Sequence, residues 1–132
     1  MSGSYLVSYG ESADRHYIKS FKKKYKHQWD VTSDAILALC ARIDNLLGTA
    51  TCDEIKRTDN RVIAKLDFAV AGTKVSPKSS GCRAILLVDQ EARTVEVLIA
   101  YHKHDIEHIN NNETLAWKSL MNDLYPEHRE LL

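Results

Sequence analysis

The feature that most constrains the fold of this chain is the stretch at residues 80–105, which reads SGCRAILLVDQEARTVEVLIAYHKHD. Two runs rich in apolar and β-branched residues, 82–88 and 94–101, flank a polar turn at 89–93. Such runs on either side of a short polar turn are typical of an antiparallel β-hairpin. The sequence therefore predicts two adjacent strands joined by a tight connection.

Side-chain alternation defines the register of this hairpin. If Asp89 pairs with Thr94, then Arg83 lies opposite Ala100, and cross-strand partners point to the same side of the sheet. A slip of one residue would turn Arg83 toward the apolar face, which constrains the pairing. The expected core face holds Cys82, Ala84, Leu86, Val88, Val95, Val97, Ile99 and Tyr101. The other face holds Arg83, Ile85, Leu87, Glu96, Leu98, Ala100, His102 and, if the strand continues, His104.

Two further strands are expected from alternating apolar residues, at residues 4–9 and 61–70. In the second of these strands, Lys65 lies on the side away from the main apolar residues. A loop rich in Gly, Ser and Pro then leads to the hairpin and carries two lysines, Lys74 and Lys78.

Two helices are expected between the first two strands. The first covers about residues 12–26 and has an aromatic stripe at helical spacing. The second begins at a cap, Thr32 or Ser33, and ends at Gly48, where a C-terminal stop belongs. The two together predict a helical hairpin that packs on one face of the sheet.

A C-terminal helix is expected from Asn112 or Glu113 to Leu124, and Pro126 stops it. Its expected apolar side holds Leu115, Trp117, Leu120, Met121 and Leu124. The order strand, helix, helix, three strands, helix predicts an α+β fold with a small antiparallel-rich sheet. We expect one domain over residues 1–132, with a core at 5–105 and the added helix at 112–125.

The formal net charge is zero, but the charges are unevenly distributed. Residues 12–27 hold six Lys or Arg and one Asp, residues 61–104 hold seven against four acids, and residues 105–132 hold two against six. A basic helix and sheet can present a local positive surface to phosphates, and the alternative is a solvated helix face.

Three cysteines, Cys40, Cys52 and Cys82, form an odd set without a CxxC motif, which favours reduced thiols in a cytosolic protein. The sequence shows no apolar run long enough to cross a bilayer and no signal peptide at its start. We therefore expect a cytoplasmic location.

The candidate catalytic residues are those expected on the uncovered face of the sheet: Lys65, Arg83, His102 and His104. A guanidinium can donate two hydrogen bonds to a phosphate, lysine adds positive charge, and histidine titrates near neutrality. This set suits RNA cleavage without a metal, in which a base removes the 2′-hydroxyl proton, cations stabilise the phosphorane charge and an acid protonates the 5′-oxygen. The candidate RNA-binding residues are Lys74, Lys78 and Lys103.

Each of these residues has an ordinary alternative role when it is taken singly. An exposed lysine or arginine on a sheet serves solubility, and a histidine at a strand end often makes a structural hydrogen bond. His104 and His108 lie four residues apart, a spacing that would put both imidazoles on one side of a helix as candidate metal ligands. We expect no metal site there, because no glutamate follows His104 as in HExxH and Lys103 would repel a cation.

These segments resemble the RelE/ParE toxin superfamily of bacterial toxin-antitoxin modules, over about residues 5–105. RelE-like members carry an S-G-Y-R run where this chain reads SGCR, so Arg83 corresponds to the family's phosphate-contacting arginine. The segment IAKLD around Lys65 resembles the lysine-bearing strand of the family. The segment LIAYHKHD resembles the closing strand, in which Lys103 matches a lysine and His104 falls on an arginine position.

The resemblance implies a RelE-like fold and a cytoplasmic toxin that cleaves mRNA on the ribosome, blocks translation without a cofactor, and is neutralised by a cognate antitoxin. The alternative within the superfamily is a ParE-like toxin, which is not an enzyme and binds DNA gyrase. A third alternative is an RNA-binding module with the same face. Two histidines beside Arg83 favour the endoribonuclease, because a binding protein has no need of titratable groups.

Overall fold

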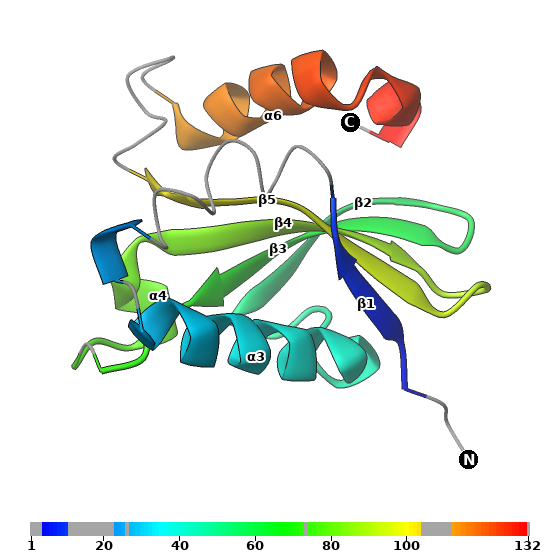
Figure 1. Ribbon diagram of the computed structural model, residues 1–132. Coiled ribbons are helices and arrows are strands. Elements are labelled where there is room, and N and C mark those ends of the chain that lie inside the picture. Colours follow the sequence, from blue (N-terminus) through cyan, green and yellow to red (C-terminus); the bar gives the residue numbers. More distant parts are fainter. Residues whose placement is uncertain (1–3, 11–22, 26, 73, 104–111, 132) are drawn as a thin grey trace.

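A computed structural model describes residues 4–10, 23–25, 27–72, 74–103 and 112–131. At its centre is a five-stranded sheet with the strand order β1-β5-β4-β3-β2 (Figure 1). Strand β1 runs parallel to β5, and all other neighbouring strands are antiparallel. The strands are Leu6–Tyr9 (β1), Cys52–Thr58 (β2), Arg61–Phe68 (β3), Cys82–Asp89 (β4) and Thr94–His102 (β5). The predicted α+β class with an antiparallel-rich sheet is confirmed.

Helices cover both faces of this sheet, with α3 on one side and α6 on the other (Figure 1). A short helical turn follows each of these two helices, and a third short helix precedes β4. The elements are His27–Ala41 (α3), Ile43–Asn45 (η2), Pro77–Ser80 (α4), Glu113–Leu124 (α6) and Pro126–Leu131 (η3). No helix in the described part of the chain is long and apolar enough to cross a membrane.

Two apolar clusters hold these layers together. On the α3 side, Trp29, Ile36 and Cys40 pack against the sheet residues Val62, Ala64, Leu66, Leu86 and Val97. On the other side, Trp117, Met121 and Tyr125 of the C-terminal segment pack against Ile63, Ile85, Leu98, Ile99 and Tyr101. The expectation of an uncovered sheet face is therefore wrong, because this face carries its own apolar residues and α6 removes them from water.

The register of the β4–β5 hairpin is confirmed from the Asp89–Thr94 pair as far as the Leu86–Val97 pair. Beyond that point Ile85 pairs with Ile99, so Leu98 is the extra residue of a β-bulge. The faces after the bulge are therefore inverted relative to the prediction. Arg83 lies opposite Tyr101 rather than Ala100, Ile99 and Tyr101 lie in the α6 cluster, and Ala100 lies in the α3 cluster.

Strand β2 is absent from the elements expected from the sequence. Its residues, CDEIKRT, are mostly charged, and a bulge between Glu54 and Lys56 interrupts its pairing with β3. Charges and a bulge are common protections of an edge strand. Asp59, which has a positive φ of 55°, and Asn60 form the turn into β3, and this Asp-Asn pair is the one local signal for the hairpin.

Helix α3 begins at His27 rather than at the predicted cap, Thr32 or Ser33. Thr32 is instead buried within the helix, where its hydroxyl donates to the carbonyl of Gln28 and accepts from the N–H of Ala71. The helix itself ends at Ala41, and η2 then leads the chain to Gly48, the predicted stop, which has a φ of +83°. The helix expected at about 12–26 lies mostly outside the described residues.

The C-terminal helix is confirmed at Glu113–Leu124, with the side chain of Asn112 accepting from the N–H of Leu115. The predicted apolar side is correct for Trp117 and Met121, which are fully buried. Leu115 is 52% exposed, and Ala116 takes the buried position next to it.

We predict that Trp117→Ala lowers the free energy of unfolding by about 3–5 kcal/mol, because it removes a fully buried indole from the α6 cluster. Leu115→Ala on the same helix should change it by less than about 0.5 kcal/mol, because Leu115 is exposed. Equilibrium urea unfolding measures both values. Similar losses for the two variants would contradict the packing of α6 on the sheet.

Candidate functional site

The SGCR segment begins where the short helix α4 ends, and its serine ties this turn to the sheet. Ser76 caps α4 by accepting from the N–H of Ser79 at 3.3 Å. The Ser80 hydroxyl donates to the carbonyl oxygens of Phe68 and Pro77, and it accepts from the N–H of Cys82 at 3.0 Å. The serine therefore holds the start of β4 against the end of β3.

Gly81 is required by both its backbone angle and its neighbour. Its φ of +81° lies in the left-handed region that favours glycine. A Cβ added at Gly81 would lie 2.7 Å from Nε2 of His102, so this imidazole lies directly over the glycine. The Gly81 carbonyl also accepts from the N–H of Lys103 at 2.8 Å, which fixes the end of β5 beside the start of β4.

Arg83 is held by groups on three sides. Its Nε lies 3.0 Å from Oδ1 of Asp67, the residue opposite it on β3. Its two terminal nitrogens donate to the carbonyls of Cys82 at 3.0 Å and Lys78 at 3.4 Å. The side chains of Arg83 and Asp67 are only 12% and 11% exposed. The guanidinium is therefore fixed in position, and its positive charge is largely balanced by the carboxylate.

Lys65 shares a sheet face with Arg83, as the sequence predicts. It lies opposite Ile85 on β4 and opposite Asp53 on β2, two positions along the sheet from the Arg83–Asp67 pair. This face is the one on which α6 packs. Lys65 therefore lies between two acidic positions beside an apolar cluster, and not on an open surface.

His102 does not share the face of Arg83 and Lys65, and that expectation is wrong. It pairs with Cys82, whose side chain belongs to the α3 cluster, because the bulge at Leu98 inverts the strand. His102 and Arg83 still lie at the same end of the sheet, on opposite faces. His104 lies outside the described residues.

The remaining predicted residues gather at the end of the sheet where β3 ends and β4 begins. Lys74 and Lys78 are exposed in the connection between these strands, and Lys103 follows the end of β5. The start of α3 reaches the same end (Figure 1), because Thr32 bonds the N–H of Ala71 at 2.8 Å. We call this region the lysine end, and its described members are Lys23, Lys24, Lys74, Lys78 and Lys103. Lys23 and Lys24 are not among the candidate residues predicted from the sequence. The basic run at residues 12–27, which contains both, is the sequence signal that indicates them.

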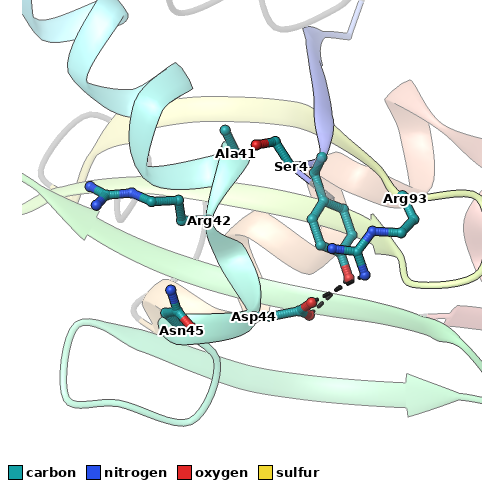
Figure 2. Close-up of a pocket in the computed structure, with 7 residues that line it drawn as sticks. Ser4, Ala41, Arg42, Asp44, Asn45 and Arg93 are labelled. Atoms are coloured by element: carbon teal, nitrogen blue, oxygen red, sulfur yellow. Dashed lines mark hydrogen bonds and ion pairs between the residues drawn. The ribbon is translucent and has the colours of Figure 1, made fainter. Parts of the chain in front are cut away.

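The opposite end of the sheet has a polar hollow of about 80 Å³, shown in Figure 2. Here the Tyr5 hydroxyl donates to Asp44 at 2.8 Å, and Arg93 donates to the same carboxylate at 3.3 Å. The Arg93 guanidinium lies over the Tyr5 ring, 4.2 Å from its centroid. Burial and the neighbouring Asp44 raise the pKa of Tyr5 to about 12. These contacts fix the β4–β5 turn to the end of α3, and the residues that line the hollow include no histidine or cysteine.

The three cysteines are free and buried, as expected for reduced thiols. Burial raises the pKa of Cys40 to about 12 and that of Cys52 to about 11, so both thiols stay protonated at neutral pH. Among the residues that the structure describes, no three His, Cys, Asp or Glu side chains are grouped to hold a metal ion.

No family model matches this chain, and no curated protein matches it in sequence. Its structure is similar to a chain of the archaeal RelE-RelB complex from Pyrococcus horikoshii OT3, with a TM-score of 0.51 and 10% sequence identity. The chain has a RelE-like fold. The match covers 75% of this chain and 94% of that chain. At this identity the similarity supports the fold that the SGCR and closing-strand motifs imply.

We predict that Gly81→Ala destabilises the protein more than Gly48→Ala. Both glycines have a left-handed φ, but an added Cβ at Gly48 meets nothing within 4 Å. Gly48→Ala should therefore cost only the backbone strain, about 1–2 kcal/mol. Gly81→Ala should cost about 1–3 kcal/mol more, because the methyl group displaces His102.

The matched measurement is urea unfolding of both variants, with and without His102→Ala. The extra cost at Gly81 should shrink when His102 is truncated, and the cost at Gly48 should not change. An extra cost that persists without the imidazole would show that His102 does not pack on Gly81.

Proposed function

We propose that this protein is a RelE-type toxin, an endoribonuclease that cleaves mRNA on the ribosome by metal-independent acid/base chemistry and is neutralised by a cognate antitoxin. The observation that carries the proposal is the lysine end, which lies beside the fixed Arg83 on a RelE-like fold. The SGCR motif supports it, because its serine and glycine position the arginine at this end.

The lysine end suits a polyanion although the whole chain is neutral. Lys74 and Lys78 are exposed, whereas the nearby Asp67 is already engaged with Arg83. Positive charge at this end is therefore left for phosphates, and it acts over about 8 Å at physiological salt. A single-stranded RNA backbone laid across Lys74, Lys78 and Lys103 would pass Arg83.

The chemical roles follow the types of side chain. Arg83 and Lys65 stabilise the charge that develops on the phosphorane oxygens. His102 or His104 removes the 2′-hydroxyl proton or protonates the departing 5′-oxygen. His102 and Arg83 lie on opposite faces of the same sheet end. The scissile phosphate must therefore lie over the open end of the β4–β5 hairpin, within reach of both side chains. The RNA therefore crosses the sheet end and does not lie flat on the sheet.

A second candidate function is that of a ParE-like toxin, which binds and inhibits DNA gyrase without catalysis. The observation that favours it is the state of the catalytic candidates. Arg83 is largely buried and ion-paired, and Lys65 lies on the face that α6 covers. A binding protein needs only the surface charges of the lysine end.

One preparation distinguishes the two functions. Programmed ribosomes are incubated with wild type, Arg83→Ala, Lys65→Ala, His102→Ala and His104→Ala, and mRNA ends are mapped by primer extension. Arg57→Ala is the control, because Arg57 is exposed at the far end of the sheet with Glu54 as its partner. Wild type should create new 3′ ends, and loss of the proton-transfer histidine should slow cleavage by about 10²- to 10⁴-fold.

Intact mRNA with wild type would remove the nuclease proposal. Inhibition of gyrase supercoiling by the same protein would then establish the ParE-like alternative. Cleavage that Arg83→Ala, Lys65→Ala and both histidine variants leave unchanged would show that the chemistry resides elsewhere in the chain.

We also predict that RNA binding depends on salt through the lysine end. The slope of log affinity against log salt for a single-stranded oligonucleotide should fall by about 0.7 for each phosphate-contacting lysine removed. Lys74→Ala and Lys78→Ala should show this change, and Arg57→Ala should not. Filter binding at several KCl concentrations measures the slope, and equal slopes for all variants would refute the placement of the RNA.

A further inference from the structure

The outer face of α3, which faces away from the sheet (Figure 1), carries a short apolar stripe that the charged Asp34 interrupts. Three residues at helical spacing form this stripe: Val31, Ala35 and Ala38. Val31 is 55% exposed, and both alanines are exposed. A surface helix normally presents polar residues on its outer side, so this stripe is a candidate contact surface.

The two ends of the stripe differ in shape and in charge. At its start, Val31 projects beside the exposed carboxylate of Asp34. At its far end lies a pocket of about 160 Å³, lined by Leu39, Arg42, Asn45 and Leu46. Arg42 is exposed. One end of the stripe therefore has a protruding Val31 beside the acidic Asp34, and the other end has a pocket beside the basic Arg42.

We propose that this stripe is a homodimer interface, in which α3 of one copy packs antiparallel on α3 of a second copy about a twofold axis at Ala38. A twofold contact brings the same patch of both copies together, so it must be self-complementary. With Ala38 at the axis, residues equally spaced on either side meet. Asp34 of each copy then meets Arg42, which directly follows α3 in the other copy, and Val31 lies toward the pocket beyond the end of that helix.

The small residues at the centre make this packing feasible. Ala35 and Ala38 allow two helix backbones to approach closely, and a shallow crossing angle of about 20° keeps the ends in contact. The antiparallel arrangement also separates like charges, because the start of α3 reaches the lysine end. The two lysine ends therefore point away from each other and stay open.

The interface is small, so we expect a weak dimer with a dissociation constant on the order of 0.1 mM. Sedimentation equilibrium from about 10 μM to 1 mM measures it. Asp34→Arg and Arg42→Asp should each weaken dimerisation about tenfold, because each creates two like-charge contacts per dimer. The double variant Asp34→Arg/Arg42→Asp restores both pairs and should recover the wild-type constant. Asp123→Arg, an equal charge change at an exposed site on α6, is the control.

A second measurement places the axis. Ala38→Cys should form an intermolecular disulfide under mild copper-catalysed oxidation by air, whereas Ser119→Cys, exposed on α6, should not. The three native cysteines are buried and do not compete. A wild-type monomer at all concentrations, a double variant that stays monomeric, or equal cross-linking of the two cysteine variants would each overturn the proposal. These readouts do not use RNA, so they are independent of the proposed nuclease function.

Discussion

The bulge at Leu98 in the inner strand β5 determines what each face of the sheet carries. Leu98 and Ile99 both point to the α6 side, and from there the alternation of β5 is reversed. Tyr101 therefore packs under α6, and His102 points to the other side. A sheet with apolar residues on both faces is stable only when both are covered, so the docking of α3 and α6 follows from the same constraint.

This arrangement moves the candidate site from a face of the sheet to its end. The α6 face is occupied by apolar packing, and Lys65 lies beside that packing between Asp53 and Asp67. Among the described residues, exposed Lys74 and Lys78 and half-exposed Lys103 gather where β3 ends, β4 begins and β5 finishes. The Ser80 hydrogen bonds and the left-handed Gly81 hold these segments together, and they fix Arg83 through its backbone neighbours.

The opposite end of the sheet is organised by a different set of contacts. The Tyr5, Asp44 and Arg93 cluster connects the β4–β5 turn to the end of α3, and it leaves a polar hollow whose lining includes no histidine or cysteine. Glu54 and Arg57 similarly form an ion pair with each other on the charged edge strand β2. These two ion pairs hold the fold at this end, whereas Lys74 and Lys78 at the lysine end are exposed.

The sequence by itself determined the features that depend on neighbours along the chain. The turn at residues 89–93, the Asn112 cap of α6 and the alternation of β3 all rest on local hydrogen bonds or on side-chain periodicity. The shared face of Lys65 and Arg83 was also predictable, because the pairing of β3 with β4 has no bulge. Only the tertiary structure decided the rest. In the run VLIAY at 97–101 every residue is apolar, so no local pattern marks the extra residue, and packing under α6 selects it. The edge strand β2 is charged and forms only because β3 offers it a partner, since strand pairing joins residues that local periodicity does not connect.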